Sequence, residues 1–313
     1  MSITPAPAAR AAPTGDTVEG FLYALAAYLF WGFLPIFMKL VAHLSTVEVL
    51  AHRVIWSVPI AFVLLLWLGR TSDISRALRS PRTLMQAAVA AGFVSVNWGI
   101  YVWAISVDRT LETALGYYIN PLLTVVVGAV LLGEKMTRAQ LVAIGFAVAA
   151  VAVLTWDTGG LPWVSLALAG SWAMYALFKK TLPIGPAQGF FLEVLLLLVP
   201  ATAYVVWLQA TGRGHFGGTG GGDVMLLIGC GFVTAVPLIL YANGAKLLKL
   251  STIGIMQYIA PTIVFLIAVF VFDEPFSTAR GVAFVLIWTG LAIYTWSMFR
   301  THRDARVTAD PTA

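Results

Sequence analysis

The chain has 313 residues, of which 60% are apolar and 11% charged, and it carries a net charge of +5. A soluble domain carries about 25% charged residues, so this composition excludes an ordinary soluble protein and indicates a chain that lies in lipid. One cysteine excludes an internal disulfide, and four scattered histidines make no metal cluster. We therefore expect neither a metal nor a cofactor. Most basic residues fall in short loops, where they set membrane orientation, so no nucleic-acid partner is expected.

Residues 1–19 are rich in Ala, Pro and Thr and carry little charge, which is typical of a disordered tail. A cleavable signal peptide would have a basic region, a short apolar run and a small-residue cleavage site. The apolar run that begins at Phe21 is instead long enough to cross a membrane. We therefore predict that it is the first membrane helix.

Apolar segments of span length then follow one another to the end of the chain. A helix crosses the hydrocarbon core with roughly 20 apolar residues, and lipid leaves the backbone no hydrogen-bond partner outside the chain, so each segment is predicted to be helical. The ten predicted spans are 20–41, 46–68, 84–107, 111–132, 139–157, 161–181, 188–209, 224–247, 252–272 and 279–299. Residues 300–313 are left as a C-terminal tail. The sequence predicts an all-α integral membrane protein.

The distribution of Lys and Arg predicts the orientation. With the N-terminus in the cytoplasm, fourteen of the 19 basic residues fall in cytoplasmic segments, four fall outside and Arg53 lies within a span. Cytoplasmic loops carry the excess of positive charge in membrane proteins. We therefore predict a multi-pass membrane protein with both termini in the cytoplasm.

The second half of the chain repeats the first. Residues 113–156 recur without a gap 140 positions later: Tyr118 corresponds to Tyr258, and Glu134 corresponds to Glu274. An internal repeat sets the architecture of a fold. In a hydrophobic chain, a two-fold repeat is typical of a secondary transporter whose binding site lies between the halves.

Each half holds five predicted spans, and an odd number means that the second half enters the membrane upside down. We predict a first five-helix repeat over residues 20–157 and a second, inverted repeat over residues 161–299. The loop at Glu134 would then face the cytoplasm and the loop at Glu274 would face outward.

Polar side chains within spans are costly in lipid and are functional candidates by default. Large aromatic rings accompany them and would stack on an apolar or aromatic substrate, although Trp and Tyr also form belts at the membrane surface. The substrate-binding candidates are Trp31, Arg53, Asn97, Trp98, Tyr101, Tyr118, Asn120, Tyr241, Gln257 and Tyr258. Arg53 would hold an anionic group of the substrate; the alternative is a side chain that snorkels to the headgroups.

Glu193 is the only carboxylate well inside a predicted span, and it lies 140 positions after Arg53. A carboxylate in lipid takes up a proton more readily than one in water, so Glu193 is a candidate proton-coupling residue. The alternative is a structural anchor that pairs with Arg53, His52 or the backbone. Arg53 and Glu193 are predicted to fall on opposite sides of the midplane, so a direct pair would need long side-chain reach or a tilted helix. The alternative is that each residue lines one half of a central cavity.

Several prolines fall within predicted spans, among them Pro35, Pro121, Pro237 and Pro261. Each lacks an N–H and leaves a carbonyl free one turn earlier, which kinks the helix. Pro121 and Pro261 are equivalent in the repeat, so we expect matching bends that shape the cavity. The alternative is that the kinks serve packing alone.

Several motifs carry a resemblance to a known family. They are Trp31-Gly32-x-x-Pro35, Glu48-x-x-x-His52-Arg53, Asn97-Trp98, Gly116-Tyr117-Tyr118-Ile119-Asn120-Pro121, Leu132-Gly133-Glu134 and Gln257-Tyr258-Ile259-x-Pro261-Thr262. Together they resemble the RarD family of the EamA-type drug/metabolite transporter superfamily, over about residues 20–300. One departure is Asp273-Glu274, where the family more often has Gly-Glu. The resemblance implies a ten-helix inner-membrane carrier with two inverted repeats that exports small metabolites or drugs.

We therefore predict a secondary active transporter, not an enzyme, that exports a small molecule by alternating access, with proton coupling through Glu193 as a further hypothesis. The expected partners are the substrate, protons and the lipid bilayer; no oligomeric state is predicted. One alternative is an integral membrane enzyme acting on a lipid-linked substrate. It would need a nucleophile, base or metal set within bonding reach, and the loops hold no such cluster. A sensor or assembly subunit is the remaining alternative.

Overall fold

The structure is a computed structural model that describes residues 16–67, 69, 71–217 and 221–309. All regular elements in these residues are helices. They are α1 (Val18–Leu40), α2 (Thr46–Trp67), α3 (Thr71–Leu78), α4 (Pro81–Ser106), α5 (Thr110–Leu132), α6 (Arg138–Thr158), α7 (Trp163–Thr181), α8 (Pro186–Ala210), α9 (Gly221–Leu247), α10 (Leu250–Met256), α11 (Ile259–Phe270) and α12 (Thr278–Ala309).

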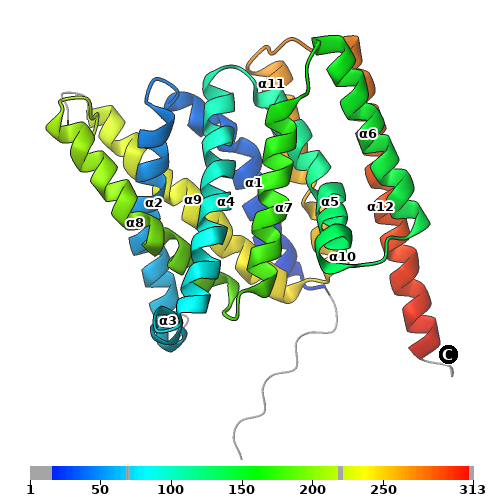
Figure 1. Cartoon of the computed structure of the whole chain (residues 1–313), viewed down its shortest axis with the longest axis horizontal. Helices are drawn as coiled ribbons and strands as arrows, with labels where there is room; N and C mark the ends of the chain where they lie inside the picture. Colours follow the sequence, from blue (N-terminus) through cyan, green and yellow to red (C-terminus); the bar gives the residue numbers. More distant parts are fainter. Residues whose placement is uncertain (1–15, 68, 70, 218–220, 310–313) are drawn as a thin grey trace, which may run out of the picture.

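The helices confirm the predicted all-α membrane fold. Nine spans in the described residues are long and apolar enough to cross a membrane, with α10 and α11 counted together as one. The remaining predicted span, 161–181, corresponds to α7, which is not among these nine; it has 19 residues and packs against α4 and α5 in the middle of the bundle (Figure 1). The short helix α3, between α2 and α4, was not predicted.

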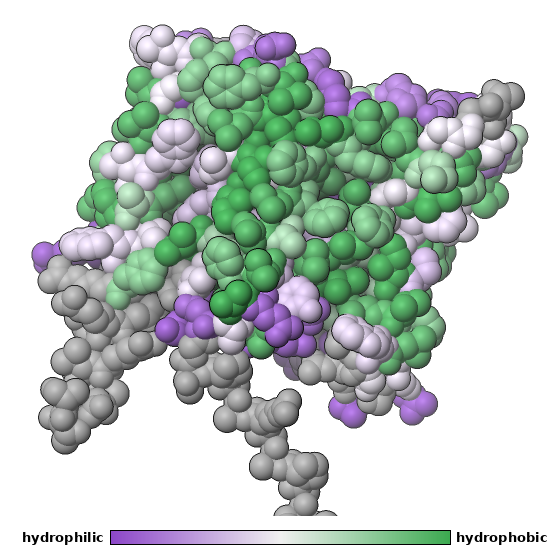
Figure 2. All heavy atoms as spheres, turned by 180° about the vertical axis from the view of Figure 1, so that it is seen from behind, coloured by the Kyte–Doolittle hydropathy of each residue, from purple (hydrophilic) through white to green (hydrophobic). Residues whose placement is uncertain are grey.

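The outer surface suits a bilayer. In Figure 2, one face of the molecule carries a broad apolar band across its middle, with hydrophilic side chains toward the two ends. Large apolar side chains are left uncovered by the protein, such as Trp156, which is 91% exposed. A monomeric soluble protein rarely leaves apolar patches of this extent open, so lipid is the expected cover.

The packing of the helices is that of two inverted five-helix repeats. The repeat equates α1, α2, α4, α5 and α6 with α7, α8, α9, α10–α11 and α12. Accordingly, the contact of α1 with α9 is matched by that of α7 with α4, and the contact of α5 with α7 by that of α11 with α1. Three pairs, α2 with α8, α5 with α11 and α6 with α12, join equivalent helices. Such a pattern is expected of a pseudo-two-fold axis between the halves.

The predicted N-terminal tail is too long by four residues. Thr17 caps α1 by accepting the Gly20 backbone N–H at 3.0 Å, and the Asp16 carboxylate accepts the Lys249 backbone N–H at 2.8 Å and the Thr252 hydroxyl at 2.9 Å. These two hydrogen bonds lower the pKa of Asp16 below its ordinary value, and the bond from the Lys249 backbone has the larger effect. The remainder of the predicted tail, residues 1–15, lies outside the described residues, as do 310–313.

The C-terminal segment is helical for most of its length. Helix α12 continues past the end of the last predicted span and reaches Ala309. The N-terminus of α1 and the C-terminus of α12 lie toward the same end of the bundle, at the bottom of Figure 1. We call this the terminal end.

Equivalent backbone turns end α5 and α11. Gly133 follows α5 with a φ of 69°, and its counterpart Asp273 follows α11 with a φ of 51°. In both turns the next backbone N–H closes the helix: Glu134 donates to the Gly128 carbonyl at 3.3 Å, and Glu274 donates to the Ala268 carbonyl at 2.9 Å. Glycine is favoured in this left-handed conformation. This explains why the family motif more often has glycine at the position that Asp273 occupies.

Candidate functional site

Arg53 lies in a buried cluster formed by α2, α4, α5 and α9. It is 3% exposed, its Nε donates to the Thr234 hydroxyl at 3.0 Å, and its guanidinium carbon lies 4.6 Å from the centre of the Trp98 ring. Tyr101 and Tyr117 lie within electrostatic reach of the charge, with their ring centres 5.7 Å apart. The side chain is enclosed by protein, so the alternative of snorkelling to headgroups does not describe it.

Asn97 ties three helices together beside this cluster. Its Nδ2 donates to the Leu168 carbonyl at 2.9 Å and to the Ser171 hydroxyl at 3.0 Å, both on α7. Its Oδ1 accepts the Tyr117 hydroxyl, on α5, at 3.4 Å. Because both ends of the amide are occupied, Asn97 positions Tyr117 and the helix α7 in this conformation.

Trp31 and Tyr241 form a second group, between α1 and α9. Their ring centres lie 5.6 Å apart, and Tyr28 packs edge-on against both, at 5.6 Å from Trp31 and 6.0 Å from Tyr241. Aromatic rings at these distances attract one another beyond their burial. The group is a platform of three rings, and Tyr28 was not among the predicted site residues.

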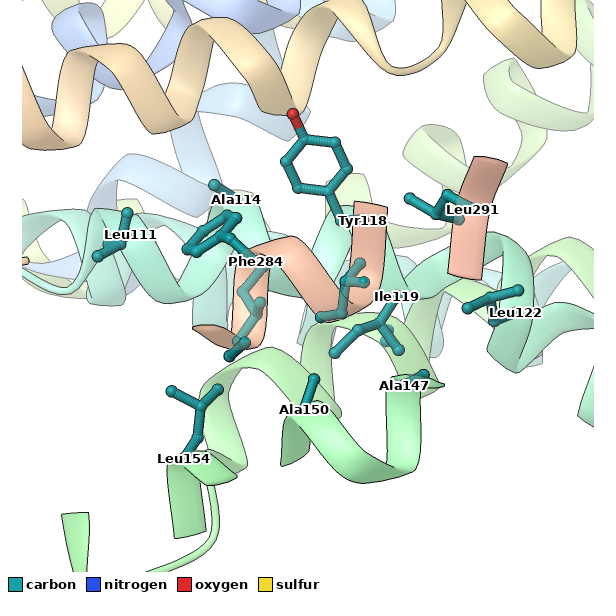
Figure 3. Close-up of a cluster of buried hydrophobic side chains, with 14 of the residues drawn as sticks. Leu111, Ala114, Tyr118, Ile119, Leu122, Ala147, Ala150, Leu154, Phe284 and Leu291 are labelled. Carbon is teal, nitrogen blue, oxygen red and sulfur yellow. The ribbon is translucent and has the colours of Figure 1, made fainter. Parts of the chain in front are cut away.

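Tyr118 and Tyr258 form a third group, where α5, α10–α11 and α12 meet. The Tyr118 hydroxyl is hydrogen-bonded to that of Thr262 at 2.6 Å, and its ring stacks on Tyr258 at 6.3 Å and meets Trp288 at 6.1 Å. In Figure 3 the Tyr118 hydroxyl points away from the apolar cluster around Ile119. These aromatic side chains line a groove of about 600 Å³.

The two amides predicted in this region differ. Asn120 lies on α5, is 8% exposed, and its Oδ1 has no hydrogen-bond partner. A buried amide oxygen without a donor is costly, so this acceptor of Asn120 is left unsatisfied in the structure. Gln257 instead lies in the turn that separates α10 from α11, and its Nε2 donates to the Gly254 carbonyl of α10 at 2.9 Å.

Glu193 is held by a cation, and that cation is not Arg53. It is 1% exposed; one carboxylate oxygen accepts Lys179 Nζ at 2.7 Å and the other accepts the Tyr175 hydroxyl at 3.0 Å. Both partners lie on α7. The predicted alternatives of pairing with Arg53, His52 or the backbone are therefore wrong, because the short connection from α7 to α8 brings Lys179 to Glu193.

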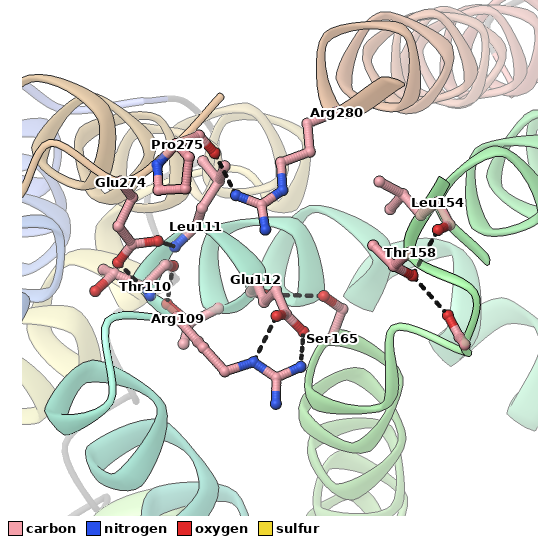
Figure 4. A network of polar contacts seen from close by, with 12 residues as sticks. Arg109, Thr110, Leu111, Glu112, Leu154, Thr158, Ser165, Glu274, Pro275 and Arg280 are labelled. Carbon is pink, nitrogen blue, oxygen red and sulfur yellow. Dashed lines mark hydrogen bonds and ion pairs between the residues drawn. The ribbon is translucent and has the colours of Figure 1, made fainter. Parts of the chain in front are cut away.

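Glu274 joins the two repeats at the end of the bundle opposite the terminal end; we call this the Glu274 end. Its carboxylate accepts the Thr110 backbone N–H at 2.6 Å and the Leu111 backbone N–H at 2.8 Å, at the first turn of α5 (Figure 4). Glu274 is 5% exposed. Backbone N–H groups at a helix start have no partner within the helix and attract a carboxylate, so Glu274 bonds the loop after α11 to the start of α5.

Further contacts reinforce the Glu274 end. Arg109 donates to both oxygens of Glu112, at 2.6 and 2.8 Å. The Ser165 hydroxyl, at the start of α7, donates to the Glu112 carbonyl at 2.7 Å. Figure 4 shows these contacts side by side with the Glu274 cap. The start of α5 is thus bonded to α7 and to the loop after α11.

Glu134, the counterpart of Glu274, makes no such closure. Its side chain is 54% exposed and accepts Lys180 Nζ at 3.1 Å. The helix start equivalent to that of α5 belongs to α10, and there the Lys249 N–H is held by Asp16 instead. Equivalent carboxylates of the two repeats therefore make different contacts.

The helices around the two equivalent prolines differ in continuity. Pro121 lies within the continuous helix α5, whereas its counterpart Pro261 lies in the first turn of α11, after a turn that breaks the helix at Gln257 and Tyr258. Matching bends at the two prolines stay a prediction. Pro35 and Pro237 lie within α1 and α9.

The structure thus divides the predicted site residues into groups. Arg53, Trp98 and Tyr101 come together; Trp31 pairs with Tyr241, and Tyr118 with Tyr258. Glu193 stands apart near the terminal end. The contacts missed from sequence are those of Tyr28, Thr234 and Lys179. No group of His, Cys, Asp and Glu that could hold a metal ion is present in the part of the chain that the structure describes.

Comparisons with known proteins identify the class. Residues 18–156 match the model of the EamA-like transporter family. The chain is 42% identical to Protein RarD of Streptomyces exfoliatus, covering 94% of this chain and 93% of that one, and 37% identical to Protein RarD of Escherichia coli strain K12, covering 92% and 97%. A crystal structure with 20% identity superposes with a TM-score of 0.58 over 90% of this chain and 98% of that chain, which supports the fold.

The protein is therefore a multi-pass membrane transporter of the drug/metabolite superfamily. It belongs to the EamA-like transporter family and, within that family, groups with the RarD proteins.

Proposed function

We propose that the chain is a secondary active transporter that exports a small metabolite or drug across the bacterial inner membrane by alternating access. One observation carries this proposal: equivalent carboxylates of the inverted repeats make unequal contacts. Glu274 is buried on the first turn of α5, whereas Glu134 has a half-exposed side chain bonded to Lys180. One end of the bundle is thereby closed by a cap that the other end lacks.

In a protein with inverted repeats, unequal contacts of Glu274 and Glu134 are what one of two alternating conformations would show. If the repeats exchange conformations, the cap at one end breaks while the equivalent cap at the other end forms, and a central site opens to alternate sides of the membrane. The difference between continuous α5 and interrupted α10–α11 supports the same exchange. If the two conformations have similar free energy, a substrate that binds one of them more tightly can shift the population of molecules toward it.

The orientation follows from the excess of basic residues near the terminal end. With that end in the cytoplasm, the Glu274 end would face outward, and the Glu274 cap would hold it closed in this conformation. A site open toward the cytoplasm would accept a substrate from within the cell, as an exporter requires.

The Glu193 ion pair supports coupling to protons. Protonation of the carboxylate would remove the charge that holds Lys179 at 2.7 Å and would free the end of α7. A proton taken up in one state and released in the other would link the proton gradient to the exchange of states.

The proposed export is tested by an untargeted comparison of intracellular and extracellular metabolites. Cells overexpress the wild type, Glu193→Gln or an empty vector. We expect a compound to be enriched outside only with the wild type. Enrichment with both proteins would remove Glu193 from the coupling mechanism, and no difference among the three strains would contradict transport of a compound present in those cells.

A further inference from the structure

Arg53 is a buried charge whose hydrogen bonds are incomplete. It is 3% exposed. Its Nε is bonded to the Thr234 hydroxyl, but Nη1 is buried without a hydrogen-bond partner. The Thr234 hydroxyl in turn donates to the Cys230 carbonyl at 2.7 Å, so it is already occupied as a donor and gives the guanidinium a neutral oxygen only.

The groups that face Arg53 from α4, α5 and α9 are neutral. Trp98 and Tyr101 face it from α4, Tyr117 from α5, and Thr234 and Cys230 from α9. None of them is a carboxylate.

The buried carboxylates of α2 and α8, Glu48 and Glu193, are bonded elsewhere. Glu48, on the same helix, accepts the backbone N–H and ring Nδ1 of His215, at 2.9 and 2.8 Å. Glu193 is bonded to Lys179 and Tyr175. Among the described residues, no ion pair with a carboxylate joins Arg53.

A guanidinium buried in this way is unfavourable unless an anion reaches it. The guanidinium also presents its N–H groups in a planar fork that matches a carboxylate. Aromatic rings surround it, and they favour a flat, apolar body next to the charge. One cation in an apolar enclosure can neutralise one negative charge, so a second charge on the same ligand would be left uncompensated.

We propose that Arg53 binds the carboxylate of a monoanionic organic substrate whose apolar or aromatic body packs against Trp98, Tyr101 and Tyr117. This inference rests on the proposed transport function and names the substrate class. Binding supplies the counterion that the protein lacks, and the guanidinium remains charged throughout, so no proton is exchanged at this position.

The test measures the charge of the exported compound and its dependence on Arg53. Metabolites inside and outside cells are compared for the wild type, Arg53→Gln, Arg53→Lys and the control Lys39→Gln. Lys39 is a cation of the Glu274 end that is bonded to the exposed Asp108 carboxylate at 2.5 Å, so the control removes one positive charge without touching the Arg53 cluster.

We expect the exported compound to carry one carboxylate and no other charge at neutral pH. Export should fall at least tenfold in Arg53→Gln, should persist in part in Arg53→Lys, and should be unchanged in Lys39→Gln. Partial activity of Arg53→Lys distinguishes loss of the charge from loss of folding, because a misfolded protein would not be rescued by another cation.

Three results would overturn the inference. A neutral or cationic compound that the wild type exports, or a carboxylate exported equally well by Arg53→Gln, would refute it while leaving the transport function intact. An absence of any exported compound would contradict the proposed function and the inference together.

Discussion

Glu193 and Lys179 are two charges that depend on each other. Glu193 is buried and Lys179 is mostly so, with 21% of its side chain exposed. In low dielectric an ion pair gains little over apolar packing, but removing one partner leaves the other uncompensated. The pair is therefore a point at which a proton can change the contact between α7 and α8.

Single substitutions in this pair should destabilise the protein more than removal of both charges. We expect Glu193→Leu or Lys179→Met to lower the free energy of unfolding by about 3 kcal/mol each. The double variant should recover most of that loss, because no unpaired charge remains. Denaturation of the purified proteins measures the effect, and additive losses in the double variant would contradict this description.

Asp273 and Gly133 occupy equivalent positions in the two repeats, both with a left-handed backbone, but only Asp273 has a side chain. An L residue at positive φ is strained by roughly 1 kcal/mol. A Cβ at Gly133 would meet nothing within 4 Å, so any loss on substitution there is conformational and not steric.

Exchanging the two residue types should change stability in opposite directions. Asp273→Gly should raise the free energy of unfolding by about 0.5 kcal/mol, since relief of strain exceeds the entropy that glycine loses on folding. Gly133→Ala should lower it by about 1 kcal/mol. Melting temperatures of the two variants provide the measurement; a lower melting temperature for Asp273→Gly would refute the strain at this position.

At the scale of elements, the main asymmetry lies between α5 and its counterpart α10–α11. The start of α5 is bonded to Glu274 and, through Glu112, to Ser165 on α7. The start of α10 is held instead by Asp16, an exposed carboxylate from the N-terminal segment. Equivalent helices are thus fixed by different partners, and the Glu274 cap is the contact that closes one end.

Removing half of the Glu274 cap should weaken α5 selectively. Glu274→Gln keeps one acceptor oxygen and loses the charge that favours a helix start, so we expect the free energy of unfolding to fall by about 1–2 kcal/mol. The matched variant Glu134→Gln, at an exposed surface pair, should change it by less than about 0.5 kcal/mol. Equal effects of the two substitutions would contradict the asymmetry.

At the scale of the whole molecule, the architecture could be predicted from the sequence because lipid imposes simple constraints. Apolar runs of span length determine the helices, and the 140-residue repeat determines their inverted packing. Span boundaries agree with the structure to within a few residues, except where α10 and α11 divide one span and where α12 continues past the predicted end to Ala309. That break falls at Gln257 and Tyr258, one turn before Pro261, which has no N–H to donate to the Gln257 carbonyl. The equivalent Pro121 lies within the continuous helix α5, so the proline alone did not predict the break.

The candidate site was predicted only in part, since sequence gives depth along a helix but not rotation about it. Tyr101 and Tyr118 were assigned to one cavity, yet Tyr101 faces Arg53 and Tyr118 faces Thr262. The Lys179 partner of Glu193 was within reach of sequence reasoning, because a short connection places the end of α7 beside the start of α8. The caps of Asp16 and Glu274 depend on helices brought together by the fold.

The exchange between the two ends is tested most directly by distances between spin labels, in a Cys230→Ala background that removes the single native cysteine. One labelled pair replaces Arg109 and Arg280 at the Glu274 end. The other replaces their counterparts at the terminal end, Lys249 and Gln140, each related to the first pair by the 140-residue repeat.

We expect Glu274→Gln to lengthen the Arg109–Arg280 distance and to shorten the Gln140–Lys249 distance in the same population of molecules. Opposite changes at the two ends are what alternating access between inverted repeats requires. If both distances lengthen together, or if the Gln140–Lys249 distance stays fixed while the other grows, the two ends are not coupled and alternating access by this exchange is wrong.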